Sequence, residues 1–320
     1  MFPTSCCTMM VCFTAGSCVE GWLAMTRRVL VTGAAGLLGR CLVRHLAGEG
    51  WSVVGLVMAA GDGADGLDRV VEGNAADPEV ARAAVAGVDA VVHLAAIPAP
   101  GLAPAEVVFG QNTLATFCIL DAATEVGVSR AVLASSLAAT GLSFSPHHAQ
   151  PSYVPIDEDL PTQAADPYAL SKLTDELTAA MMTRRSGMTT TALRMPFLGT
   201  PADRLGQHAA LLAGDPLRGR GDLWCYLDTR DAARAIGLSL ERDSGDSLVI
   251  GVAAPDNLTP YPTEQLLDAF LPGVPRRAPL PGRSSLMDLT RAEAVLGFHA
   301  EHLWPVQPVD LPSHFREESP

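Results

Sequence analysis

The stretch RVLVTGAAGLLGR, residues 28–40, decides the fold. An apolar run leads into a Thr-Gly turn, glycines recur at positions 33, 36 and 39, and a helix-like run follows at once. Between a strand and a helix, Gly33 would allow a tight turn, Gly36 a close backbone approach to a pyrophosphate, and Gly39 close packing of the helix on the strand. Phosphates would then lie at the helix N-terminus, where unpaired N–H groups and the helix dipole favour negative charge. A lone glycine triad is equally compatible with a structural turn, but the flanking strand and helix favour a dinucleotide-binding loop.

After this loop, short apolar runs alternate with longer amphipathic stretches. We expect strands at 28–32, 52–57, 69–72, 89–94, 130–135 and 189–195, and helices at 37–48, 78–86, 113–126 and 167–185. The strands are continuous apolar runs, as expected when helices cover both faces of a sheet. The pattern predicts an α/β fold, a Rossmann-type doubly wound parallel sheet. From residue 196 onward the chain is richer in proline and its elements are shorter, which predicts a smaller C-terminal substrate-binding lobe.

The 320 residues carry a formal net charge of −13, with 48% hydrophobic and 18% charged residues. An acidic chain without a basic cluster repels nucleic acid and anionic membranes, so we expect a small-molecule substrate, no nucleic acid and no membrane partner. Four of the seven cysteines fall in the first 24 residues, in a spacing that is not a zinc pattern, so no metal is expected. The odd cysteine count without a disulfide framework predicts a reducing, cytoplasmic location.

The stretch DPYALSKLTDE, residues 166–176, provides a second signal. Tyr168 and Lys172 are four residues apart on a predicted helix, so their side chains share one face. A tyrosine phenol, with an ordinary pKa of about 10, is a poor acid or base at neutral pH, and a neighbouring ammonium stabilises its phenolate. A third signal is Ser136 after the strand 130–135, because ligands bind at the carboxyl ends of strands in a doubly wound sheet. Taken singly, each motif is more often an exposed helix face or a helix cap.

Together and in this order, these motifs resemble the extended short-chain dehydrogenases/reductases, also called the NAD-dependent epimerase/dehydratase family. The resemblance includes the Thr-Gly-x-x-Gly-x-x-Gly loop, VVHLAA (91–96), PIDEDLP with DPYALSK, ALRMPFLGTP (192–201) and YLDTRDAARA (226–235). It covers the chain from about residue 27 to about residue 305. It implies an enzyme whose cofactor is NAD or NADP, and a homodimer in which the helices 105–126 and 167–185 pair the subunits.

Carried over residue by residue, the resemblance implies Tyr168 as general acid/base and Lys172 as the group that stabilises its phenolate and bonds the nicotinamide ribose. Ser136 would orient the substrate carbonyl or hydroxyl, and Asn112 would support a proton relay. The cofactor-binding residues that it implies are Gly33, Gly36, Leu37, Leu38, Gly39, Asn74, Ala75, Leu94, Ala95, Ala96, Tyr168, Lys172 and Pro196. Hydride transfer itself is the chemistry of the cofactor, for which the protein supplies orientation and electrostatics.

The second predicted strand departs from the family pattern. It ends in Val57 and Met58, where an acidic residue would bind the adenosine ribose, and Asp62 comes too late unless the loop folds back. No arginine stands at this strand end to favour a 2′-phosphate, and Arg40 in the first helical turn is as readily a solvated residue as a phosphate contact. Asn74 replaces the aspartate that the family usually turns toward the adenine. NAD and NADP therefore both stay open.

The substrate side departs from the family pattern as well. Leu137 and Ala138 follow the strand-end serine where dehydrating members of the family have an acid–base carboxylate pair. Trp224 stands nearest the position of the arginine that binds the diphosphate of nucleotide sugars, with Arg218 and Arg220 upstream as substitutes. These differences argue against dehydration and weaken the case for a nucleotide-sugar epimerase.

We therefore expect an NAD(P)-dependent oxidoreductase that transfers a hydride between nicotinamide and a hydroxyl or carbonyl of a small polar or sugar-like substrate. The alternatives are a sugar or nucleotide-sugar epimerase with tightly bound NAD and, less favoured because both Tyr168 and Lys172 are present, a non-catalytic dinucleotide sensor. Residues 25–195 would form the NAD(P)-binding Rossmann domain with the catalytic helix, and 196–320 mainly the substrate-binding lobe, with segments returning to the sheet. Residues 1–24 would be an N-terminal extension, disordered or a mis-assigned start, because Met25 directly precedes the first strand region.

Overall fold

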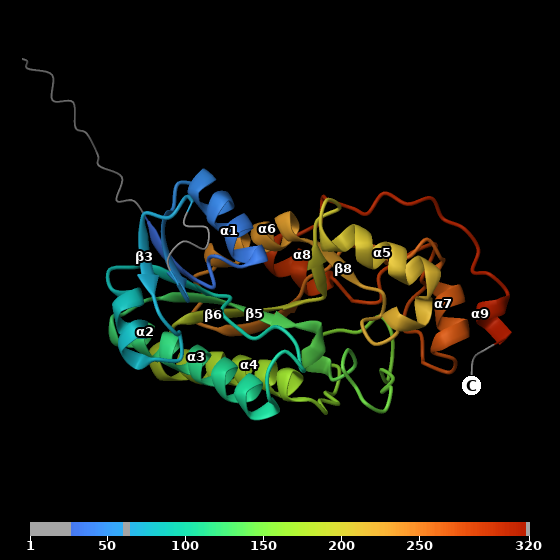
Figure 1. The fold of residues 1–320 in the computed structure, drawn as a ribbon, viewed down its shortest axis with the longest axis horizontal. Coiled ribbons are helices and arrows are strands. Elements are labelled where there is room, and N and C mark those ends of the chain that lie inside the picture. The colour runs from blue at the N-terminus through green and yellow to red at the C-terminus, as the bar shows by residue number, and fades with distance from the viewer. Residues whose placement is uncertain (1–26, 60–64, 318–320) are drawn as a thin grey trace, which may run out of the picture.

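The computed structural model describes residues 27–59 and 65–317, with side chains to residue 315. Its centre is a parallel sheet of seven strands in the order β3-β2-β1-β4-β5-β6-β9 (Figure 1). The strands are β1 (Arg28–Thr32), β2 (Ser52–Val57), β3 (Arg69–Glu72), β4 (Ala90–His93), β5 (Arg130–Ser136), β6 (Thr189–Met195) and β9 (Ser247–Gly251). The strand order reverses beside β1, so β1 and β4 flank the switch point at which doubly wound folds bind ligands. The expected fold class is confirmed.

Helices cover both faces of this sheet (Figure 1). On one face lie α1 (Leu37–Gly48), α6 (Thr229–Leu240) and α8 (Thr290–Leu296), which pack with the sheet in one apolar cluster. On the other face lie α2 (Pro78–Val85), α3 (Ala105–Glu125) and α4 (Pro167–Ser186), which share a second cluster with it. The double cover explains why most of the strands read as continuous apolar runs, because helices keep water from both faces of the central strands, whereas the edge strand β3 is partly exposed.

A smaller lobe lies at the end of the molecule away from β3 (Figure 1). It contains the two-stranded parallel sheet of β7 (Phe197–Gly199) and β8 (Tyr226–Asp228), with α5 (Arg204–Gly214), α7 (Thr263–Phe270) and α9 (His314–Glu317). The short helices η1 (Leu137–Thr140) and η2 (Pro216–Gly219) border it. A third apolar cluster forms its interior, and residues from the 142–160 loop pack into that cluster. The chain leaves this lobe for α6 and β9, which joins the edge of the main sheet, and again for α8, which packs on that sheet.

Most expected elements coincide with those of the structure. The largest difference is α3, which begins at Ala105, as in the helix 105–126 implied by the resemblance, and therefore eight residues before the helix at 113–126 expected from the residue pattern. The helix as a whole shows little amphipathic period, its first two turns hold Gly110, and Pro104 is its N-cap. The expectations for residues 1–24 and for Asp62 lie outside the described residues. Among the residues that are described, no helix has both the length and the apolar character needed to cross a membrane.

Candidate active site

A cavity of about 570 Å³ opens at the carboxyl ends of β1, β2 and β4. Its size is that of a small-molecule site. Eight of the expected site residues line it, namely Gly33, Gly36, Asn74, Ala75, Leu94, Ala95, Ala96 and Asn112. The other seven do not line it, namely Leu37, Leu38, Gly39, Ser136, Tyr168, Lys172 and Pro196, the last of which is buried directly after β6. The structure therefore gathers most of the expected set around one cavity and places the rest behind or beside it.

The glycine-rich turn has the geometry that the sequence predicts. Gly33 has a positive φ of 67°, and a Cβ there would stand 3.0 Å from the backbone nitrogen of Ala95. Gly36 is exposed and is the N-cap of α1, with no side chain bonded to the free N–H groups of the first turn. A Cβ at Gly39 would lie 2.2 Å from the carbonyl oxygen of Gly33, so only glycine lets α1 come this close to the turn. The turn therefore offers exposed backbone donors to an anion.

The cavity wall contains no ionisable side chain among the described residues. Val57 and Met58 line it at the end of β2, as expected from their positions. Opposite them, the Asn74 amide donates to Gln111 Oε1 at 2.8 Å, and Asn74 Oδ1 accepts the backbone N–H of Ala76 at 2.9 Å. The sequence reasoning missed Gln111, whose only signal is its place beside Asn112 in the third helix. Among the described residues, this wall has no carboxylate that would select the ribose 2′-hydroxyl of NAD and no arginine that would select the 2′-phosphate of NADP.

Helix α4 places Tyr168 beside the cavity. The carboxylate of Asp166 caps the helix by accepting the backbone N–H groups of Tyr168 and Ala169, both at 2.9 Å, and Pro167 holds the first helical position. The Tyr168 side chain is 8% exposed and packs against Ala138 and Val108. The cap therefore fixes the turn from which the phenol projects.

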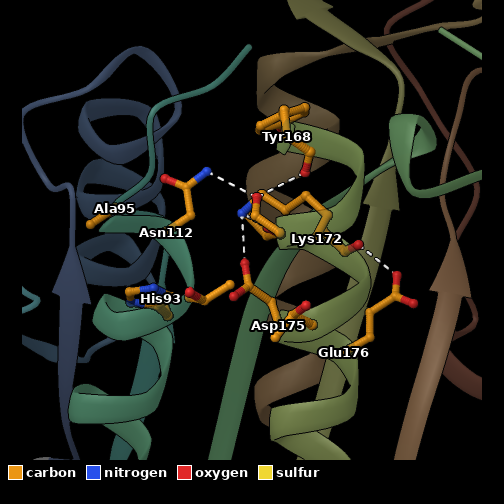
Figure 2. A network of polar contacts seen from close by, with 12 residues as sticks. His93, Ala95, Asn112, Tyr168, Lys172, Asp175 and Glu176 are labelled. Carbon is orange, nitrogen blue, oxygen red and sulfur yellow. Dashed lines mark hydrogen bonds and ion pairs between the residues drawn. The ribbon is translucent and has the colours of Figure 1, made fainter. Parts of the chain in front are cut away.

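Asn112 connects the cavity to α4. Its Oδ1 accepts the backbone N–H of Ile97 at 2.8 Å, and its Nδ2 donates to Ile97 O and to Ser171 Oγ, both at 3.1 Å. Ser171 Oγ in turn donates to Tyr168 O at 2.8 Å (Figure 2). A buried amide with these partners is rigid, so it holds the cavity wall and the first turn of α4 in a fixed relation.

Lys172 is buried one turn after Tyr168, and it is the only lysine among the 22 lysine and arginine residues of the sequence. Its Nζ donates to Ala134 O at 3.0 Å and to Asp175 Oδ2 at 3.2 Å (Figure 2), and lies 5.9 Å from the centre of the Tyr168 ring. Burial alone would lower the pKa of Lys172, but the Asp175 carboxylate, helped by Tyr168 and Glu176, raises it above its ordinary value. The ammonium therefore stays charged beside the phenol.

Ser136 ends β5 and is half-buried. Its Oγ accepts the backbone N–H of Ala138 at 3.1 Å and so caps η1, the structural role that a polar strand end often has. Ala138, whose N–H this cap holds, shares a small apolar cluster with Tyr168. A capping hydroxyl keeps its own hydrogen free for another acceptor.

Two buried polar groups escaped the sequence reasoning. Asp175 and Glu176 follow Lys172 on α4, and Glu176 binds the guanidinium of Arg194 at 2.8 and 2.9 Å. Ser135 Oγ also donates to Glu176 Oε1, at 2.6 Å. The spacing from Lys172 marks Asp175 as a neighbour on the same face, but only the packing of α4 on the sheet shows that both carboxylates are buried.

The residues expected near a substrate diphosphate do not gather at the cavity. Trp224 is fully buried in the core of the smaller lobe, where its indole N–H donates to Pro216 O at 2.7 Å. Arg218 is exposed and pairs with Asp215 at 3.0 Å. Leu137 is buried in the same core, so the position after Ser136 holds an apolar side chain where dehydrating members of the family have a carboxylate.

A glycine-rich turn at the switch point of a parallel sheet, facing an uncharged cavity, defines a Rossmann-type nucleotide-binding protein. The family model described as the NAD dependent epimerase/dehydratase family matches residues 29–251. The chain belongs to this family, and the resemblance noted from its motifs is confirmed.

Three relatives illustrate the likeness. UDP-glucose 4-epimerase of Bacillus subtilis is 28% identical over 196 residues, which are 56% of each chain, and the chain spans about half the length of several curated relatives that it matches. The 2-alkyl-3-oxoalkanoate reductase of Stenotrophomonas maltophilia is 29% identical over 298 residues, 87% of this chain and 84% of that one. The crystal structure of a short-chain dehydrogenase/reductase superfamily protein from Agrobacterium tumefaciens with bound NAD is 26% identical, with a TM-score of 0.64 over 92% of this chain and 96% of that chain.

Proposed function

We propose that this protein is an NAD(P)-dependent oxidoreductase that transfers a hydride between nicotinamide and a hydroxyl or carbonyl of a small polar or sugar-like substrate. One observation carries the proposal: a phenol and a buried, charged ammonium stand one turn apart on α4, tied through Asn112 to the wall of the cavity. The glycine turn and the size of the cavity fit a dinucleotide, and the similar Agrobacterium protein has NAD bound.

In this proposal Tyr168 exchanges a proton with the substrate oxygen, and Lys172 stabilises the phenolate and donates to the nicotinamide ribose. Ser136 orients the substrate oxygen with the hydroxyl hydrogen that its capping bond leaves free. Gly33, Gly36 and the start of α1 hold the pyrophosphate through backbone N–H groups. Asn112 keeps the cavity wall and α4 in register. When bound, the nicotinamide accepts or supplies the hydride.

Replacing the Tyr168 hydroxyl tests the assignment. We expect Tyr168→Phe to lower kcat by about 10²- to 10⁴-fold, because the proton transfer loses its donor and acceptor. NADH affinity, measured by fluorescence, should change by less than about twofold, because the cavity wall is untouched. Tyr261→Phe, which removes a phenol that bonds Ala213 O in the smaller lobe, is the matched control and should keep full turnover. Full activity of Tyr168→Phe would refute the proposed role.

An epimerase that retains its cofactor is the second candidate, favoured by the similarity to UDP-glucose 4-epimerase. It differs in being redox-neutral: the purified protein would carry tightly bound NAD and turn over without added cofactor. The buried position of Trp224 and the surface pairing of Arg218 argue against a diphosphate subsite. A steady change of nicotinamide absorbance during turnover, with NAD and NADP run in parallel, would decide for the oxidoreductase.

We further propose that residues 25–195 form the cofactor-binding domain and residues 196–320 mainly the substrate-binding lobe, a division that the separate apolar cluster around Trp224 supports. We propose a cytoplasmic enzyme, a location supported by the three free cysteines of the described chain, Cys41, Cys118 and Cys225. We propose a homodimer, supported by large apolar side chains exposed on the outer sides of α3 and α4.

A further inference from the structure

Lys172 has a buried carboxylate as its partner, and the family motif that identified the lysine does not account for it. Asp175 lies on the next turn of α4, its side chain is 4% exposed, and its Oδ2 is 3.2 Å from Lys172 Nζ. Figure 2 shows the lysine between Tyr168 on one side and Asp175 on the other. We propose that Asp175 is a positioning residue for the reaction, whose carboxylate fixes the Lys172 ammonium beside Tyr168 and keeps it charged. The inference rests on the proposed function for its role in turnover, but not for its effect on the lysine.

The other charged groups around Lys172 cannot take this role. Glu176 is bound on both oxygens by Arg194, at 2.8 and 2.9 Å, and accepts the Ser135 hydroxyl as well. His93, on β4, is held neutral, because burial and the nearby ammonium lower its pKa to about 3. Tyr168 is the group to be stabilised. In the described part of the chain, Asp175 is the one ion-pair partner of the lysine.

A need for stability does not explain a carboxylate at this position. A buried ion pair gains little over well-packed apolar side chains, because both charges must leave water. Aspartate is also a weak helix former, and Asp175 lies in the interior of α4. Burial raises the pKa of Asp175 although the Lys172 ammonium lowers it, so the carboxylate is held at a cost that the ammonium offsets only in part. A charge retained under these conditions is best explained by what it does to Lys172.

The composition of the chain points the same way. Every other lysine or arginine position in the sequence is an arginine, yet residue 172 is a lysine. An ammonium is compact and can donate in three directions, and here it donates to Ala134 O and to Asp175 Oδ2. The same ammonium loses its proton readily when it is buried without a counter-charge. A site that needs a small, permanently charged donor therefore needs both Lys172 and Asp175.

The single lysine makes the test direct. Protein labelled with ¹³C at the lysine ε-carbon gives one lysine signal, from Lys172, whose chemical shift reports the charge of the amine without substrate or turnover. The wild type should show no titration below about pH 10. In Asp175→Asn, which keeps the shape and an accepting oxygen, the midpoint should fall by at least about one pH unit. Asp175→Glu, which keeps the charge, should stay closer to the wild type than Asp175→Asn does.

The control is Asp121→Asn, which removes an equal charge from α3, where Asp121 pairs with Arg185 at the surface. It should leave the lysine signal unchanged. Equal midpoints in the wild type and Asp175→Asn would overturn the proposal, and so would a wild-type midpoint below about pH 8. The second outcome needs no variant, so poor folding of Asp175→Asn does not remove the test. Because the signal is read without turnover, its failure is separate from that of the Tyr168→Phe experiment.

Discussion

His93 is a buried residue whose neighbours determine which ring nitrogen carries the proton. Thr32 Oγ1 accepts the backbone N–H groups of Leu94 and Ala95, both at 3.1 Å, so its own hydrogen is directed to His93 Nδ1 at 2.9 Å. This assigns the proton of the ring to Nε2, which has no partner within the described chain. The neutral ring is thus built into the end of β4, beneath Ala95 at the cavity wall.

The pKa of His93, lowered to about 3 by burial and then by Lys172, predicts a pH dependence of stability. Because the unfolded histidine binds its proton near its ordinary pKa of 6.5, stability is present above that pH and is lost as the pH falls toward 3. Between about pH 7 and about pH 4.5 this group alone should cost about 2–3 kcal/mol of the free energy of unfolding. Urea unfolding at a series of pH values should show that the free energy of unfolding of His93→Gln falls less toward low pH than that of the wild type. Parallel curves for the two proteins would contradict the assignment.

For single residues, the sequence predicts contacts within one helix or strand better than contacts between two elements. The four-residue spacing places Tyr168 and Lys172 on one face of a helix, and the structure shows them there. The burial of Asp175 depends on how α4 packs against β5 and α3, which no local pattern encodes. The cavity wall opposite Met58 depends likewise on Gln111 meeting Asn74 across the fold.

Among the elements, α1 depends most on its glycines. A Cβ at Gly39 would lie 2.2 Å from Gly33 O and 2.6 Å from Ala34 O, both rigid backbone atoms. Gly39→Ala should therefore lower the free energy of unfolding by at least about 1–3 kcal/mol and weaken NADH binding, because α1 must move away from the turn. A Cβ at Gly48, at the far end of the same helix, would meet no atom within 4 Å, so Gly48→Ala should stabilise by up to about 1 kcal/mol. Thermal unfolding with NADH titration measures both, and equal effects of the two substitutions would contradict this account of the turn.

The elements themselves were the most predictable part of the fold. β1, β2, β3 and β6 begin and end at the expected residues, because each is rich in apolar or β-branched residues. The residue pattern missed the start of α3, although the resemblance gave this helix as 105–126, because α3 as a whole has little of the amphipathic period that marks a surface helix. In the homodimer proposed above, the outer side of residues 105–112 would contact the second subunit and not water.

For the whole molecule, α3 and α4 lie side by side on one face of the sheet (Figure 1) and expose a patch of large apolar side chains. The patch consists of Val107, Leu114 and Phe117 on α3 and Leu170 and Leu177 on α4. Two neighbouring helices can pair with the same two helices of a second copy about a twofold axis, which covers the patch on both.

Charge placed in this patch should therefore separate the subunits. Leu177 is 69% exposed, and Leu177→Glu should convert the protein from a dimer to a monomer in sedimentation experiments, because two like charges would face each other across the axis. Leu211→Glu, at an exposed apolar residue of α5 in the smaller lobe, is the matched control and should stay dimeric. A wild type that sediments as a monomer would rule out the homodimer.

The presence of a single lysine has a practical consequence for handling the protein. Lys172 is 4% exposed, so across these 320 residues no lysine amine is available at the surface. Dyes, cross-linkers and supports that couple to lysine will find almost nothing to attach to until the fold opens. The rate at which such a reagent modifies Lys172 therefore reports how often α4 opens, and a ligand bound in the neighbouring cavity should lower that rate.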